Sequence, residues 1–377
     1  MELSYWEIKT WLSRLDYCIV GSGITGLSCA LELRQRHPDA RILVLERGVF
    51  PQGASTKNAG FACFGSLTEI LSDLQTHSEQ EVMELVSDRW SGIQLLRSRL
   101  GDMAMGYRQW GGYEVFLDGE TRSLERCRDE MGRINALLYP VFGQDAFRPA
   151  ENSFGFRGVL PTLLLNPLEG QIDTGRTMEA LLDKVRRQEN PVMIVNGVRL
   201  EGYEDGDLGV RVQTSHFEFR AARLLIATNG FAAELDPLPV LPARAQVVVT
   251  EPIPGLALKG TFHLEEGYYY FRNIGDRVLL GGGRNLDKAG ETTTEFGQTA
   301  LIQDRLATLL EEVIAPGRPL QIAHRWSGIM GVGPQKRPVV KRLSENVACG
   351  VRLGGMGVAI GSHVGRQLAL LAGREPI

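Results

Sequence analysis

The apolar positions near the start of the chain follow two different spacings. The run Cys18–Val20 is continuous, and small residues follow it. A helical pattern comes next, and a second continuous run, Ile42–Leu45, ends on Glu46. Continuous apolar runs on either side of a helical pattern predict a strand, a tight turn, a helix and a second strand.

Strands that end in glycine-rich turns recur twice more. One apolar strand ends in Ala227–Gly230, and another ends in Gly354–Gly357 before a final helix from about Val358 to Ala372. Between these turns, helical spacing covers about Ser66–Leu100, and β-like alternation covers Gln246–Gly283. The pattern predicts one nucleotide-binding domain assembled from distant segments, with a second domain inserted twice.

This organisation gives the expected fold class and boundaries. We expect an α/β, Rossmann-like FAD/NAD(P)-binding domain assembled from residues 1–65, 151–240 and 323–377. A substrate domain of α+β type, built on an antiparallel sheet, should comprise residues 66–150 and 241–322. A chain of 377 residues is long enough for both.

The first turn carries candidate chemistry. In Gly21-Ser22-Gly23-Ile24-Thr25-Gly26, Gly21 allows the turn, Gly23 lets the backbone approach a pyrophosphate, and Gly26 allows close helix–strand packing. The helix N-terminus favours phosphate, and Glu46 can bind ribose hydroxyls. Taken alone, the three glycines could also form a turn with a purely structural role and no ligand.

Composition and charge exclude several function classes. The net charge of −4 gives no basic footprint for nucleic acid or an anionic membrane, and no apolar run approaches a membrane span. The five cysteines and six histidines form no metal-binding motif, so no metal is expected. The N-terminus does not resemble a signal peptide, so a cytoplasmic protein with reduced cysteines is expected.

At this point the residues resemble the D-amino acid oxidase (DAO) superfamily of FAD-dependent oxidoreductases, in the manner of glycine oxidase and sarcosine oxidase. Six blocks in order carry the resemblance: GSGITG with Glu46, GASTKNAG at 53–60, ATNG at 227–230, YYYFR with LLGGG at 268–283, RWSG at 325–328, and GGMG at 354–357.

The resemblance implies non-covalent FAD, because no cysteine lies near Arg325 to form a flavin link. It also assigns the cofactor-binding positions: Gly21, Gly23, Ile24, Gly26, Glu46, Arg47, Ser55, Thr56, Asn58, Gly60, Val198, Thr228, Asn229, Gly230, Gly328, Gly355, Met356 and Gly357. The last three residues would present a helix N-terminus to the negatively charged edge of the flavin.

Three family positions carry different residues in this chain. Met330 stands where glycine oxidase-like proteins have a carboxylate-binding Arg, and Ala359 where sarcosine oxidase-like proteins have a Lys. Leu279 stands where those oxidases carry the lysine used for oxygen activation. Another cation must therefore serve, or the substrate is not an α-amino acid; Arg272, Lys57 and Arg352 are the candidates.

Tyr268, Tyr270, Arg272 and Trp326 are the candidate catalytic residues. Each has a structural alternative: tyrosines favour strands, Arg272 suits an ion pair, and Trp326 suits packing.

The resemblance implies oxidation of the C–N bond of a small amine or amino acid by hydride transfer to flavin N5, with hydrolysis of the imine. Electrons would pass to O2 or to a carrier. Two alternatives stay open: a 2-hydroxy acid substrate, which would need His263 or His324 as a base, and a flavin-binding protein without turnover.

Overall fold

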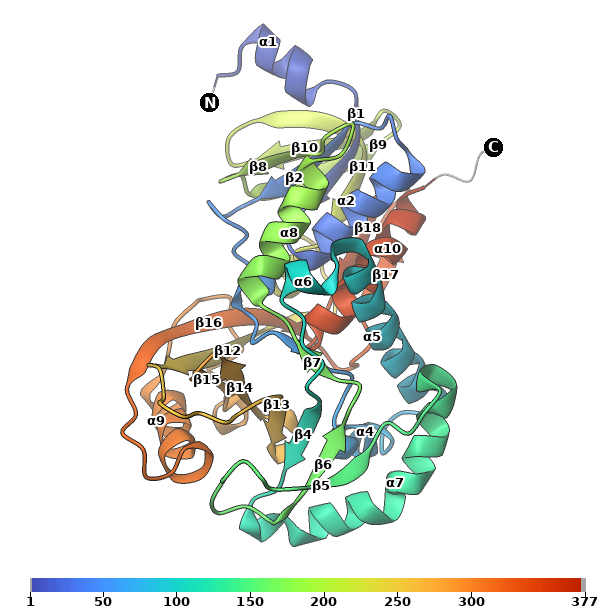
Figure 1. The fold of residues 1–377 in the computed structure, drawn as a ribbon. Coiled ribbons are helices and arrows are strands. Elements are labelled where there is room, and N and C mark those ends of the chain that lie inside the picture. Colours follow the sequence, from blue (N-terminus) through green and yellow to red (C-terminus); the bar gives the residue numbers. More distant parts are fainter. Residues whose placement is uncertain (1, 374–377) are drawn as a thin grey trace.

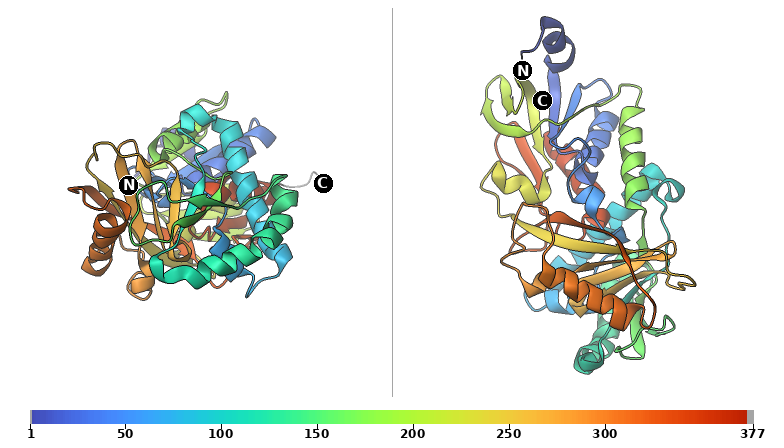
Figure 2. Two further views of the ribbon diagram at one scale, coloured as in Figure 1. Left: turned by 60° about the horizontal axis from the view of Figure 1, so that its bottom comes forward. Right: turned by 90° about the vertical axis from the view of Figure 1, so that its left-hand side faces the viewer.

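The computed structural model describes residues 2–373, arranged as two sheets with helices packed on them (Figure 1). In the view of Figure 1 the sheet that contains β1 lies above the sheet that contains β12 and β16. Figure 2 shows the same vertical arrangement from the side. The molecule is therefore elongated along the line that joins the two sheets.

The upper sheet is built around β1 (Leu15–Val20), which pairs in parallel with β2 (Ile42–Glu46) and β11 (Glu218–Ile226). Within β1 and β2, Cys18–Val20 and Ile42–Leu45 are continuous apolar runs because these parts of the strands are buried. The order across the sheet is β17 (Val339–Arg342), β18 (Val347–Val351), β11, β1, β2 and β8 (Met193–Asn196), with β9 (Leu200–Gly206) and β10 (Gly209–Thr214) added beside β11.

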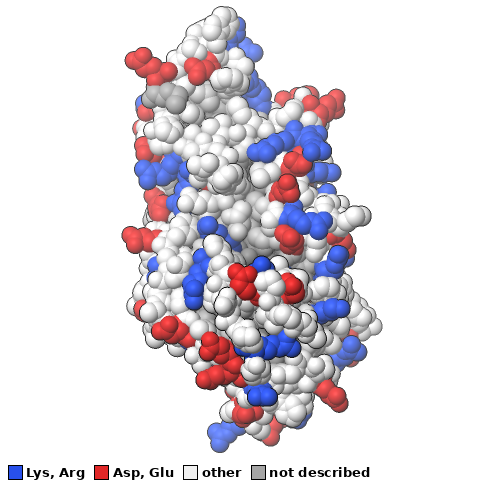
Figure 3. Space-filling view, turned by 60° about the vertical axis from the view of Figure 1, so that its left-hand side comes forward, with Lys and Arg blue, Asp and Glu red and all other residues white. Residues whose placement is uncertain are grey.

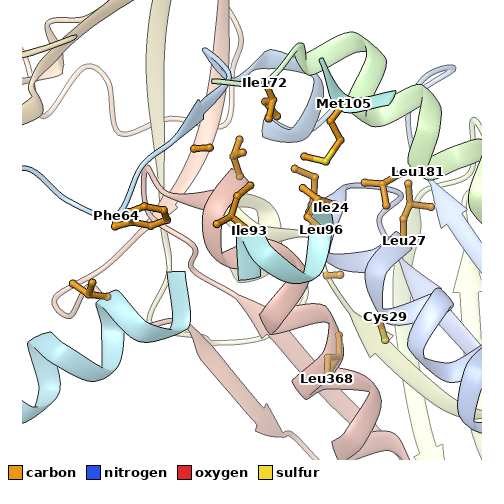
Figure 4. Close-up of a cluster of buried hydrophobic side chains, with 14 of the residues drawn as sticks. Ile24, Leu27, Cys29, Phe64, Ile93, Leu96, Met105, Ile172, Leu181 and Leu368 are labelled. Atoms are coloured by element: carbon orange, nitrogen blue, oxygen red, sulfur yellow. The ribbon is translucent and has the colours of Figure 1, made fainter. Parts of the chain in front are cut away.

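Helices α2 (Ile24–Arg36) and α10 (Gly357–Ala372) pack closely against each other. A Cβ atom at Gly365 would lie 2.5 Å from the carbonyl oxygen of Thr25, so the two backbones touch. Figure 4 shows the buried cluster that surrounds this contact. Its labelled side chains come from α2, α10, α5 (Glu79–Leu100), α8 (Thr174–Arg186) and nearby segments.

The lower sheet is mostly antiparallel and has its own core, in which Phe262 and Phe271 stack with ring centroids 4.8 Å apart. Helices α9 (Ala300–Thr308), α7 (Thr121–Phe142) and α4 (Leu67–Asp73) accompany it. The strand order is β16 (Ile322–Val332), β12 (Leu241–Thr250), β15 (Arg277–Gly282), β14 (Tyr269–Ile274), β13 (Thr261–Leu264), β4 (Gly112–Val115), β6 (Thr162–Asn166) and β5 (Arg148–Glu151).

Short elements complete the chain, and two of them join the sheets. Strands β3 and β7 pair with each other between the two sheets and lie beside the loop that follows β2. The short elements are α1 (Tyr5–Glu7), α3 (Ala54–Lys57), α6 (Asp102–Met105), β3 (Phe61–Ala62) and β7 (Gly170–Gln171).

The predicted fold class, a Rossmann-like domain of discontinuous segments with an inserted antiparallel-sheet domain, is confirmed. The strand pairing differs from two of the expected boundaries. Strands β6 and β16 lie in the lower sheet, although the sequence boundaries put 151–240 and 323–377 in the cofactor domain. Strand pairing joins β16 to β12, about eighty residues earlier, and local spacing carries no signal for such a partner.

Acidic and basic side chains alternate over the face in Figure 3, without a broad patch of one sign. Among the helices of residues 2–373, none combines the length and the apolar character that a bilayer crossing requires.

The α2–α10 contact gives a direct stability test. Gly365→Ala should lower the free energy of unfolding by about 1–3 kcal/mol, because the new methyl group overlaps Thr25, Ser28 and Cys29. The matched control is Gly132→Ala on α7, where no atom lies within 4 Å of the added carbon. Urea unfolding of both variants measures the difference, and equal stabilities would show that α10 can move aside.

Candidate functional site

The turn after β1 can be made only with glycine at two positions. Gly21 has φ +105°, and a Cβ atom there would lie 2.8 Å from the carbonyl oxygen of Ala227. A Cβ atom at Gly26 would lie 1.9 Å from the carbonyl oxygen of Gly21. The N-terminus of α2 is thereby held against the ends of β1 and β11, with its unpaired N–H groups directed into the space beyond.

Ser55 closes one side of this turn. Its hydroxyl oxygen accepts a hydrogen bond of 2.9 Å from the amide of Ile24, the first residue of α2. A Cβ atom at Gly23 would lie 2.7 Å from the same oxygen. The second glycine therefore allows the 53–60 loop to approach the helix N-terminus.

Glu46 ends β2 as a buried carboxylate in a fixed orientation. Its oxygens accept hydrogen bonds from the Ser22 hydroxyl at 2.7 Å, the Ser22 amide at 3.2 Å and the Gly48 amide at 2.9 Å. Only 5% of the residue is exposed, yet it borders the main cavity. A carboxylate oriented by donors of its own chain can still accept hydrogen bonds from ligand hydroxyl groups.

The main cavity has a volume of about 670 Å³ and runs between the two sheets. The N-termini of α2 and α10 both border it, so two helix dipoles direct their positive ends into one space. The predicted cofactor residues in its wall are Gly21, Gly23, Ile24, Glu46, Arg47, Ser55, Asn58, Val198, Thr228, Asn229, Gly328, Gly355, Met356 and Gly357.

The donors and acceptors of this wall fit a dinucleotide. The Thr228 hydroxyl is buried at the wall and has no hydrogen-bond partner among the described residues. A buried hydroxyl without a partner is costly, and a ligand oxygen would satisfy it. The Glu46 carboxylate suits the ribose hydroxyls of FAD, and the two helix N-termini suit its two phosphates.

Four predicted cofactor residues are not in the wall. Thr56 donates its hydroxyl to the carbonyl oxygen of Pro51 at 2.6 Å. Gly26, Gly60 and Gly230 lie against backbone carbonyl groups, where a side chain would collide. These residues shape the cavity from behind rather than border it.

Tyr268 and Tyr270 both border the cavity, on the side formed by the lower sheet. Burial raises the pKa of Tyr270 to about 12, so its hydroxyl is neutral. Its ring meets Phe61 edge to face, with centroids 5.6 Å apart. Tyr268 is more exposed, at 38%. Both tyrosines therefore border the cavity, and that they line a substrate pocket stays a prediction.

Arg272 and Trp326 lie behind the wall. The guanidinium of Arg272 donates to the carbonyl oxygens of Ala59, Ile172 and Asn273, and burial lowers its pKa to about 10. The Trp326 ring nitrogen donates to the carbonyl oxygen of Lys57 at 2.9 Å. Both side chains tie the 57–61 loop to the lower sheet, so the prediction that they contact substrate has no support in their contacts.

The other two candidate cations border the cavity but are already engaged. Arg352 donates to the carbonyl oxygens of Arg337 and Pro239. The Lys57 ammonium lies 5.2 Å from the ring centroid of Phe296. The structure places another cation at the cavity, which the sequence prediction missed.

That cation is Lys336, in the loop after β16. Its Nζ lies 3.0 Å from Glu69 Oε1 and 2.6 Å from Asp73 Oδ1, and all three residues border the cavity. Arg89 adds a second cation 3.6 Å from Glu69. Burial opposes the charge on Lys336, but the two carboxylates raise its pKa above the usual value. The only local signal was a pair of acids four residues apart on α4.

His263 is a further titratable residue of the cavity wall. It is 7% exposed, and burial lowers its pKa to about 4. His324 lies on the exposed part of β16, stacked on Trp326 with ring centroids 5.7 Å apart, outside the wall. Of the two histidines named as candidate bases, His263 alone borders the cavity.

Two buried carboxyl groups behind His263 were also missed. Burial raises the pKa of Glu169 to about 8 and that of Glu114 to about 7. Neither forms an ion pair with Lys or Arg within residues 2–373. In the sequence both look like ordinary polar positions, because the burial of a single acid does not change the spacing of apolar residues around it.

Fold and site together define a two-domain flavoprotein oxidoreductase, in which a dinucleotide cradle opens onto a second sheet. The chain belongs to the family of FAD dependent oxidoreductases (DAO), whose profile matches residues 16–371. The predicted resemblance is thus confirmed, and the cofactor is FAD.

Curated relatives cover most of the chain at low identity. A probable oxidoreductase OrdL of Rhizobium meliloti is 24% identical over 95% of this chain and 83% of its own. The gamma-glutamylputrescine oxidoreductase of Escherichia coli is 24% identical over 94% and 83%. The glycine oxidase of Pseudomonas aeruginosa is 25% identical over 95% of both chains.

Solved structures share the fold. Glycine oxidase from Geobacillus kaustophilus superposes with a TM-score of 0.74 at 19% identity, covering 95% of this chain and 94% of its own. L-proline dehydrogenase from P. horikoshii gives a TM-score of 0.73 at 16% identity, with 95% and 93% covered.

Glu46→Gln should weaken FAD binding about tenfold, because a charged acceptor for the ribose hydroxyls becomes neutral. The readout is the FAD dissociation constant, measured by flavin fluorescence after acid release and readdition. Glu218→Gln, an exposed acid on β11, is the matched control. Equal affinities for the two variants would remove Glu46 from the cofactor site.

The buried acids also predict a pH dependence of stability. Folded Glu114 and Glu169 have pKa values above the unfolded value of 4.5, so their contribution is complete below that pH and is lost as pH rises through about 7 to 8. From pH 6.5 the free energy of unfolding should fall by up to about 1.4 kcal/mol per pH unit for each group until the pH reaches that group's folded pKa, and it should level off above about pH 8.

Urea unfolding in this range measures the slope. His263 does not contribute there, because its lowered pKa acts only below its ordinary value of 6.5. Glu169→Gln should flatten the slope, and an unchanged slope in that variant would contradict the assignment.

Proposed function

We propose that this enzyme oxidises the C–N bond of a small amine or amino acid. The observation that carries the proposal is the composition of the cavity beyond the cofactor cradle. There Tyr268, Tyr270 and Phe61 form an aromatic wall, and Lys336 with Glu69 and Asp73 forms a charged one. An aliphatic amine that carries a charged group needs both.

FAD, when bound, supplies a hydride acceptor for the carbon next to nitrogen. The chain's own residues then bind and orient the substrate and exclude water. The neutral Tyr270 hydroxyl is a donor and acceptor for a polar substrate atom. Glu69 and Asp73 provide acceptors for an ammonium group, and Lys336 provides donors for a carboxylate.

Lys336 takes the place of the missing carboxylate clamp in this proposal. Two carboxylates occupy two of its three N–H donors, and 42% of its side chain stays exposed. A substrate carboxylate can therefore join the cluster without displacing Glu69 or Asp73. The relatives named glycine oxidase and gamma-glutamylputrescine oxidoreductase support amines and amino acids as the class to test first.

A 2-hydroxy acid is the second candidate, because His263 borders the cavity and could take a hydroxyl proton. The proposal includes non-covalent FAD and a cytoplasmic location, in keeping with five buried free cysteines. For the acceptor, Leu279 on β15 leaves O2 and an electron carrier as the two possibilities.

The first experiment mixes the FAD-loaded enzyme anaerobically with glycine, sarcosine, L-proline, iminodiacetate, putrescine and L-lactate, and follows bleaching of the flavin absorbance. At least one amine or amino acid should bleach the flavin faster than lactate. Bleaching by lactate alone would support a 2-hydroxy acid as the substrate instead. If no compound bleached the flavin, the proposed function would be contradicted.

Lys336→Met then tests substrate recognition. For the best amino acid, KM should rise about tenfold, since a hydrogen bond to a charged group contributes roughly 1.5–3 kcal/mol. For putrescine, which lacks a carboxylate, KM should stay the same or fall, because Glu69 and Asp73 lose their cation. Lys341→Met on the exposed strand β17 is the matched control, and an equal rise for both substrate types would contradict the assignment.

A further inference from the structure

A second, much smaller cavity lies beside the part of the main cavity wall that β13 forms. His263 borders both the main cavity and a small cavity of about 10 Å³. That volume is close to the ~10–15 Å³ that a single water molecule needs. The residues that line the small cavity include Glu114 and Glu169, both of which are at least 95% buried.

The two ring nitrogens of His263 have different surroundings. A Cβ atom at Gly267, which borders the main cavity, would lie 3.9 Å from Nδ1. Nε2 is buried without a hydrogen-bond partner among the described residues and lies 3.9 Å from Oε2 of Glu169. The imidazole therefore bridges the substrate space and a buried carboxyl group.

Glu169 is held in place on its other side. Its Oε1 accepts a hydrogen bond of 2.8 Å from the amide of Phe64, in the segment that follows β3. A Cβ atom at Gly112 would lie 1.8 Å from Oε2, so glycine at the start of β4 makes room for the carboxyl group. Position and orientation are thus both fixed by the fold.

We propose that His263 and Glu169 form a buried acid–base pair that takes up the proton lost by the substrate nitrogen. This rests on the proposed function, because an ammonium group must lose a proton before its carbon can give up hydride. The substrate N–H bond breaks and its proton binds Nδ1. The Nε2–H bond breaks and that proton binds the Glu169 carboxylate.

Charge and atoms balance in this step. The substrate changes from ammonium to amine, Glu169 changes from carboxylate to carboxylic acid, and His263 remains neutral with its proton on the other nitrogen. No electrons are transferred. A cation and an anion are both neutralised, so the step is favoured in a buried site.

The pKa values of the two groups favour transfer of the proton to Glu169 over retention of the proton on the imidazole of His263. Burial makes His263 alone a weak base, with its pKa at about 4, whereas burial raises the pKa of Glu169 to about 8. Catalysis by an acid–base group is most effective when its pKa lies near the working pH. The other titratable groups on this wall are Glu69 on α4, Glu114 on β4, Tyr270 on β14, and Cys63 and Glu266 in loops.

The kinetic test is the pH profile of anaerobic flavin reduction by the best amine of the panel. Wild-type holoenzyme should show a rate that rises to a plateau above pH 8. In Glu169→Gln and His263→Gln, the midpoint of that rise should move to higher pH, up to the pKa of the free amine. The rate at pH 8 should then fall by about a hundredfold, the lower end of what positioned acid–base groups contribute.

Glu114→Gln is the matched control, because it neutralises a buried acid that lies opposite His263 on β4 but makes its hydrogen bonds with Thr68. It should keep the rise, with the midpoint moved to lower pH, since repulsion from Glu114 raises the pKa of Glu169. Wild-type profiles in both Glu169→Gln and His263→Gln would overturn the pair. If Glu169→Gln fails to fold or to retain FAD, His263→Gln carries the test.

A second readout needs no substrate. Infrared titration of the holoenzyme should show a protonated-carboxyl band with one component that disappears around pH 7, from Glu114, and one that disappears around pH 8, from Glu169. The component that disappears around pH 8 should be present in the wild type and in His263→Gln and missing from Glu169→Gln. A component that still titrates around pH 8 in Glu169→Gln would overturn the pair. If the band titrates around pH 8 as expected but no amine bleaches the flavin, the proposed function alone would be overturned.

Discussion

The architecture depends on close backbone contact between α2 and α10. Each helix begins directly after a strand of the upper sheet, so packing the two side by side directs both N-termini into the same cavity. The contact requires glycine at Gly365, as the turn before α2 requires it at Gly21 and Gly26. Because no side chain separates these backbones, two helix dipoles converge on one ligand. The packing of these two helices therefore sets the position of FAD, independently of the charged residues around the cavity.

Local patterns were sufficient for this part of the molecule. The three strand-to-glycine turns are short-range features, and each appears in the sequence as an apolar run followed by small residues. The long helix α7 was not predicted, although its residues are spaced to bury Leu124, Ile134 and Leu138. The assignment of β16 to the lower sheet could not be predicted either. Its partner β12 is distant in the chain, and pairing between such strands depends on the completed fold.

The substrate side was harder to predict, for an electrostatic reason. Arg272 was named because it is a cation in one of the blocks that carry the family resemblance, but buried carbonyl groups take up its donors. Lys336 is far from Glu69 and Asp73 in the sequence, so their ion pairs exist only in three dimensions. Glu169 is similar: its unusual proton affinity comes from burial, and burial of one acid cannot be read from its neighbours along the chain.

The order of segments in the upper sheet has a consequence for synthesis. Strand β18 pairs with β11, and α10 supplies one end of the cavity, yet both lie in the last thirty or so described residues. While the ribosome is still adding these residues, the edge of β11 that will receive β18 has no partner. The nascent chain must therefore keep an apolar parallel edge from pairing with other chains until β18 has been translated. Flavin uptake must then follow the synthesis of α10, more than a hundred residues after β11.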